Sequence, residues 1–157
     1  MALGVAIAFG GAACSSNSAP PRGPAATEPT TTKPPTAPRQ TVLKARLSGR
    51  SVVPGPGAIS GSGSATLTVD LVAGQVCYQL TATNTDPALG AAVYTGPAGA
   101  IGPKTIELEP PAKGKSDSCA PVDRGLLESI VANPSGFYIR VDNIQFPGGA
   151  LRGQLAT

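Results

Sequence analysis

Apolar and polar side chains alternate with a period of two along much of the chain after residue 40. The clearest run spans residues 65–71, where every second residue is apolar and the residues between are Thr or Asp. The alternation resumes over residues 76–82, after the turn Ala73-Gly74. A period of two is typical of a half-buried β-strand, and two such strands around a tight turn predict a hairpin.

Shorter stretches with the same pattern predict further strands. They lie at residues 43–47, 91–95, 104–108, 137–141 and 150–155. Segments rich in Gly and Pro separate several of them and are typical of turns. These seven strands predict an all-β domain over residues 41–157, built as an antiparallel β-sandwich or barrel.

One stretch departs from the period of two. Its apolar residues at 126, 127, 130 and 131 fall on one face of a helix, which predicts a short helix over residues 123–132. Asp123 is a suitable N-cap for this helix, and Asn133-Pro134 would end it.

The first residues follow another pattern. Residues 2–13 are all apolar or small, and the run ends in Gly11-Ala12-Ala13 directly before Cys14. This run is too short to span a membrane and is typical of a signal peptide. The small residues before Cys14 resemble a bacterial lipobox, which implies cleavage before Cys14 and lipidation of its thiol; an ordinary signal peptide is the alternative. No Lys or Arg precedes the run, so we expect the natural start codon to lie upstream.

Residues 14–40 are rich in Pro, Thr, Ser and Ala and contain no large apolar side chain after Cys14. Such a segment cannot bury enough surface to offset the entropy lost on ordering. We therefore expect signal peptide 1–13, a disordered and extended tether over 14–40 that begins at the lipidated Cys14, and the β domain over 41–157. A Pro-rich recognition segment for a partner is the alternative role of the tether.

The chain has three cysteines, Cys14, Cys77 and Cys119. Export would place them in an oxidising compartment, where disulfides form and persist. With Cys14 lipidated, we expect Cys77 and Cys119 to form a disulfide that fixes the polar loop 112–121 to the sheet. Two reduced structural thiols are the alternative.

Composition narrows the candidate chemistry further. The chain contains no His, which removes the commonest metal ligand and the usual acid–base group near neutral pH. The net charge is only +3 and the Lys and Arg residues are scattered, unlike the basic patch of a nucleic-acid-binding protein. We therefore expect no catalytic residue, no bound metal or cofactor, and no nucleic-acid partner.

Several short motifs resemble those of the CHRD domain, a repeat first described in chordin. The opening motifs are Leu-Ser-Gly at 47–49, Val-Pro at 53–54 and Gly-Ser-Gly-Ser-Ala at 61–65. Gly-Pro-Ala at 96–98 resembles the turn after the central strand, and residues 146–155 resemble the closing motif, which is the most specific. The resemblance implies a β-sandwich or barrel shaped like Cu/Zn superoxide dismutase.

Many CHRD domains carry a His-x-His before the Gly-Pro turn and another His on the penultimate strand. The matching positions here are Val93, Thr95 and Asp142, which form a weak ligand set because Val has no donor atom. Thr95, Asp142 and Arg152 remain as a candidate polar site. Arg152 either grips a ligand or holds the structure together, through an ion pair with Asp142 or through loop carbonyls.

These observations predict a non-catalytic binding module, lipid-anchored to the outer face of the bacterial cell membrane. Its expected partner is an envelope or extracellular protein or a glycan. A degenerate, dismutase-like metal-binding domain and a structural envelope component are the alternatives.

Lipidation of Cys14 can be tested directly. We expect mass spectrometry of membrane-extracted protein to find an N-terminal peptide that begins at Cys14 and carries acyl chains. Because more than one acyl chain gives stable anchoring, the Cys14→Ala variant should lose its membrane association. A mature protein with an unmodified Cys14 would refute the lipoprotein prediction.

Overall fold

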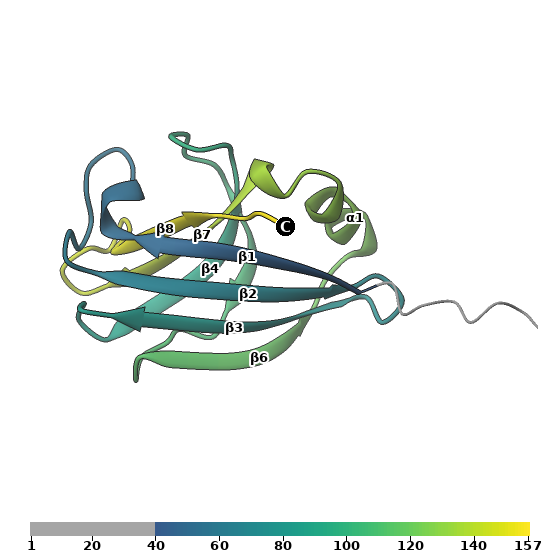
Figure 1. The fold of residues 1–157 in the computed structure, drawn as a ribbon, viewed down its shortest axis with the longest axis horizontal. Coiled ribbons are helices and arrows are strands. Elements are labelled where there is room, and N and C mark those ends of the chain that lie inside the picture. Colours follow the sequence, from purple (N-terminus) through teal and green to yellow (C-terminus); the bar gives the residue numbers. More distant parts are fainter. Residues whose placement is uncertain (1–39) are drawn as a thin grey trace, which may run out of the picture. The chain divides into compact units, whose positions relative to one another are not determined.

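The computed structural model describes residues 40–157, so the predicted signal peptide, Cys14 and nearly all of the tether lie outside the described residues. Within them, eight strands form one antiparallel sheet, accompanied by one α-helix (Figure 1). The strands are β1 (Gln40–Ser48), β2 (Ser62–Asp70), β3 (Gln75–Thr83), β4 (Ala88–Thr95), β5 (Lys104–Leu108), β6 (Lys115–Pro121), β7 (Phe137–Asn143) and β8 (Leu151–Gln154).

The sheet curls into a barrel that is nearly closed. Its strand order is β5-β4-β7-β8-β1-β2-β3-β6, and the two edge strands, β5 and β6, approach each other. The backbone N–H of Glu109 donates to the Tyr78 hydroxyl at 2.7 Å, and the Ser116 hydroxyl donates to the Glu109 carbonyl at 2.7 Å. These contacts join the end of β5 to β3 and β6, so the predicted β architecture is confirmed in its barrel form.

The barrel interior is filled by the apolar residues whose alternation predicted the strands. Side chains on alternate positions of a strand point to opposite faces, so one face of every strand supplies the core. Each fully buried aliphatic side chain contributes about 1.5–3 kcal/mol of hydrophobic stabilisation. The fully buried members include Leu43, Leu67, Val69, Leu80, Val93, Ile139, Val141 and Leu151.

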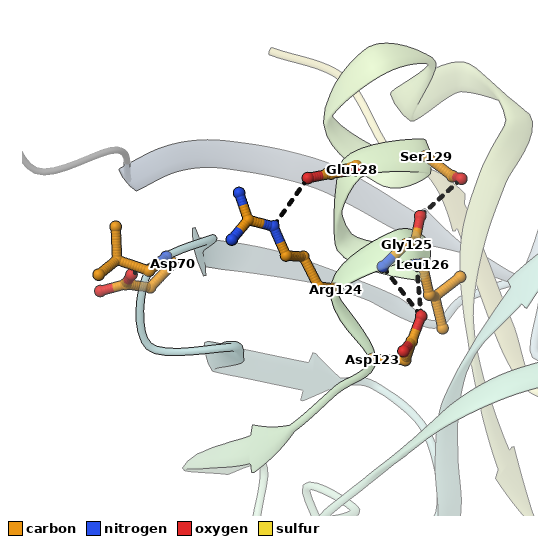
Figure 2. Close-up of polar contacts among 8 residues, drawn as sticks. Asp70, Asp123, Arg124, Gly125, Leu126, Glu128 and Ser129 are labelled. Carbon is orange, nitrogen blue, oxygen red and sulfur yellow. Dashed lines mark hydrogen bonds and ion pairs between the residues drawn. The ribbon is translucent and has the colours of Figure 1, made fainter.

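Helix α1 (Arg124–Ala132) lies at one end of the barrel and packs Leu127 and Ile130 into the core (Figure 1). The Asp123 carboxylate accepts the N–H groups of Gly125 and Leu126 at 2.9 and 3.2 Å (Figure 2). The predicted helix and its N-cap are therefore confirmed. In residues 40–157, no helix has the length and apolarity required for a membrane span.

The segment expected to be a polar loop, residues 112–121, is mostly strand β6, so that prediction is wrong. None of the side chains of β6 is buried, and the segment therefore has no apolar period to reveal it. It is held by backbone pairing with β3, as is common for a polar edge strand. Cys119 lies directly opposite Cys77 in this pairing, and the predicted disulfide is present. The bond joins two paired strands.

Removal of the disulfide should destabilise the domain substantially. The bonded cysteines are 42 residues apart, and on the chain-entropy account a crosslink over that separation contributes about 4 kcal/mol by restricting the unfolded chain. We expect denaturant titration of Cys77→Ala/Cys119→Ala to show a loss of that order. Wild-type protein under reducing conditions is the control and should lose as much stability as the double variant. A loss in the free energy of unfolding below about 1 kcal/mol would contradict the crosslinking role.

Candidate functional site

The outer face of β4, β7 and β8 carries a second set of packed side chains. Tyr94 and Tyr138 lie opposite each other on β4 and β7, and Arg140 and Arg152 lie opposite each other on β7 and β8. The two rings are stacked with their centroids 5.3 Å apart. The Arg140 guanidinium carbon lies 4.4 Å from the Tyr94 centroid, and that of Arg152 lies 3.6 Å from the Tyr138 centroid. We call this cation–ring–ring–cation arrangement the Arg–Tyr stack.

The Arg140 end of the stack is electrically compensated. Arg140 donates through Nε and Nη2 to the two carboxylate oxygens of Asp142, at 2.7 and 3.0 Å. Both side chains are about one-fifth exposed. Such a two-point contact between guanidinium and carboxylate is strong and fixes the geometry of both groups. Both carboxylate oxygens of Asp142 are therefore bound by Arg140.

The Arg152 end has no such compensation. Arg152 is only 3% exposed, and within residues 40–157 no carboxylate forms an ion pair with it. Its Nη2 donates to the Pro97 carbonyl at 3.0 Å. Burial lowers the pKa of Arg152, and the nearby Arg140 acts in the same direction while Tyr138 opposes it. A buried cation is costly without a counter-charge, and the Tyr138 ring offsets only part of that cost.

Three side chains hold the loop of residues 96–102 against this face. Arg152 binds the Pro97 carbonyl, and the Tyr138 hydroxyl accepts the Gly102 N–H at 3.3 Å. Gln154 places Nε2 within 2.7–2.8 Å of three carbonyl oxygens, one of them that of Gly96. The Gly-Pro turn and the closing motif, which are far apart in the sequence, therefore contact each other directly.

A pocket of about 330 Å³ opens beside Arg152. It lies between the loop 96–102 and the segment that follows β1, which begins with a 3-10 turn (Gly49–Ser51). The lining residues are Arg46, Arg50, Ser51, Val53, Ala98, Gly99, Arg152, Gly153 and Gln154. We call this the arginine pocket.

The structure does not bring Val93, Thr95 and Asp142 together. Val93 is fully buried in the core, and Thr95 is an exposed residue at the end of β4. Asp142 lies on β7 opposite Gly90 and belongs to the outer face. The ion pair suggested between Asp142 and Arg152 is also not formed, because Arg140 lies on the same face of β7 as Asp142 and binds both of its carboxylate oxygens. Arg152 instead binds a loop carbonyl, the other structural role foreseen for it.

These residues also do not fit a metal ion. Val93 has no donor atom, and Arg140 occupies both carboxylate oxygens of Asp142. In the described part of the chain, no group of three or more His, Cys, Asp or Glu side chains is placed to hold a metal. The histidine cluster implied by the resemblance therefore has no working equivalent at these three positions.

The sequence pattern did not reveal the Arg–Tyr stack or the role of Gln154. One signal was available, because a period of two places Tyr94, Tyr138, Arg140 and Arg152 on the strand faces opposite the core. The order of the strands was not available, and without it the four residues could not be recognised as neighbours.

Arg152 should contribute to the stability of the domain and to the order of the loop 96–102. We expect Arg152→Ala to lower the free energy of unfolding by about 2 kcal/mol, since it removes a buried charged hydrogen bond and the contact with Tyr138. Hydrogen exchange at Gly102, whose N–H is held by Tyr138, should accelerate. Arg46→Ala, at an exposed site on β1, is the control and should change stability by no more than about 0.5 kcal/mol. Equal stability of the two variants would refute the structural role of Arg152.

Comparison with protein families matches residues 43–155 to the CHRD domain. No curated protein and no solved structure matches the chain significantly. The family match spans β1 to the end of the closing motif, and so includes both segments that meet at Arg152 and Gln154. The chain therefore belongs to the CHRD domain family.

Proposed function

We propose that this CHRD domain is a non-catalytic binding module and that its ligand occupies the arginine pocket. The observation that carries the proposal is the pocket itself, which opens between two loops on a firmly held outer face. Pockets of similar volume occur elsewhere on residues 40–157, and this one is distinguished by its three arginines and by the loop held beside it. A surface fixed before binding loses less entropy when a ligand arrives.

Binding without catalysis is supported by how the polar groups are used. Arg140, Asp142 and Gln154 are engaged in contacts that hold strands and loop in place. The chain has no His to act as a general base near neutral pH. The arginines in the pocket are good donors to a ligand but poor proton-transfer groups, since a guanidinium stays protonated in proteins.

The disulfide indicates a protein that works outside the cytoplasm, because such bonds persist in oxidising compartments. We further propose that a lipid on Cys14 anchors the chain to the outer face of the cell membrane and that residues 14–40 hold the domain away from it. The small residues before Cys14 and the Pro-rich composition after it support this arrangement. The partner would then be an envelope or extracellular protein or a glycan.

The binding role predicts saturable association of the full chain with isolated cell envelopes. Ala98→Trp should weaken this association about tenfold or more, because an exposed residue of the pocket rim is replaced by a side chain large enough to fill the pocket. Ile144→Trp is the matched control, since Ile144 is 77% exposed and does not line the pocket. The measurement is competition between labelled and unlabelled protein.

Two outcomes would count against the proposal. Envelopes that take up labelled protein without saturation or competition would show that no specific partner exists, as expected for a purely structural component. Equal binding by wild type and Ala98→Trp would place the ligand elsewhere on the domain.

A further inference from the structure

We propose that the arginine pocket binds an oxyanion, that is, a carboxylate, sulfate or phosphate group carried by the ligand. This inference rests on the proposed binding function and adds the chemical class that the pocket recognises. Its evidence is the distribution of charge around Arg152.

Cationic side chains are concentrated in this pocket. Arg46, Arg50 and Arg152 line it, and these are three of the five arginines in residues 40–157. No Asp or Glu is among the lining residues. Acidic and basic residues are nearly balanced over the domain, so the excess of positive charge is local. Like charges held together in a concave site attract an anion and are stabilised by it.

Arg152 gives this charge a fixed position in the lining of the pocket. Its side chain is nearly fully buried, stacked on Tyr138 and hydrogen-bonded to the Pro97 carbonyl. A buried cation normally has an anionic partner. Asp142 supplies that partner at the Arg140 end of the Arg–Tyr stack, whereas among the described residues no carboxylate does so for Arg152. The uncompensated end of the stack is the end that lines the pocket.

Arg46 and Arg50 supply exposed guanidinium groups at the same site. Arg46 lies on β1 and Arg50 in the 3-10 turn that follows, and no carboxylate of residues 40–157 forms an ion pair with either. A guanidinium presents a planar fork of N–H donors that matches a carboxylate or phosphate. Two exposed guanidinium groups and one buried guanidinium group therefore line the same pocket and can donate to an oxyanionic group.

The aromatic rings of this face are not available for stacking with a ligand. Tyr94 is covered by Arg140 and Tyr138, and Tyr138 is covered by Tyr94 and Arg152. Proteins that bind single-stranded nucleic acids use exposed aromatic faces as platforms for bases. The pocket therefore favours an acidic group over a nucleobase.

Anion binding can be measured on the purified full chain by NMR. Sodium sulfate, sodium phosphate and sodium glucuronate would be added in separate titrations at a constant ionic strength of about 0.15 M. We expect at least one of these anions to give saturable chemical-shift changes. The shifts should be confined to backbone amides of the pocket, including Arg50, Ser51, Ala98 and Gly99. At this ionic strength the Debye length is about 8 Å, so diffuse attraction is largely screened. The order of the three affinities would identify the preferred group.

Two double variants distinguish anion binding in the pocket from a general effect of positive charge on the protein surface. Arg46→Gln/Arg50→Gln should raise the dissociation constant about tenfold or more, since it removes two charged hydrogen-bond donors. Lys44→Gln/Lys115→Gln removes the same charge from exposed positions outside the pocket and should leave binding unchanged. Absence of saturable shifts with all three anions, or equal weakening by both double variants, would overturn the inference.

Failure of this inference is distinguishable from failure of the binding function. Envelope association that is lost in Ala98→Trp but retained in Arg46→Gln/Arg50→Gln would overturn oxyanion recognition and leave the binding module intact. Saturable anion binding by a protein that does not associate with envelopes would support the pocket chemistry and remove its proposed cellular role.

Discussion

Strand β8 is the constraint on which the rest of the structure depends. It lies between β7 and β1, and so joins the β5-β4-β7 side of the sheet to the β1-β2-β3-β6 side. The strand has only four residues and must approach β1 very closely. A Cβ on Gly153 would lie 2.3 Å from the Arg46 carbonyl oxygen, so this position requires glycine. Without this approach the two parts of the sheet could not form one barrel.

The same strand organises both faces of the sheet. Leu151 is fully buried in the core, whereas Arg152 and Gln154 belong to the outer face and hold the loop 96–102. The closing motif thus combines barrel closure with construction of the arginine pocket. Because Asp142 compensates Arg140 but nothing comparable compensates Arg152 within the described residues, the outer face is electrically asymmetric. This uncompensated positive charge at Arg152 is the feature of the fold on which the proposed recognition of an acidic group depends.

Most strands of this fold could be predicted because each buries one side against the core. The alternation in residues 65–71 and 76–82 reflects that burial, and β2 and β3 form there as expected. The short helix was predictable for a related reason, since its apolar face and the Asp123 cap are local features. Strand β6 was not predictable in this way. It buries no side chain and exists because β3 offers free backbone groups and Cys77 forms a bond with Cys119.

The sequence by itself determined the β class, the positions of the strands that bury one side, and the single helix, because these follow from local periodicity. The pairing of Cys77 with Cys119 followed from the expected export of the chain and the expected lipidation of Cys14. The sequence also identified Arg152 as a residue with either a ligand or a structural role. Only the tertiary structure decided which residues meet on the outer face. Val93 and Asp142 match two histidine positions of other CHRD domains but belong to opposite faces of the sheet, whereas Arg152 and Tyr138 become neighbours only when β8 pairs with β7. Strand order and register are set by the packing of the whole barrel, and no local pattern encodes them.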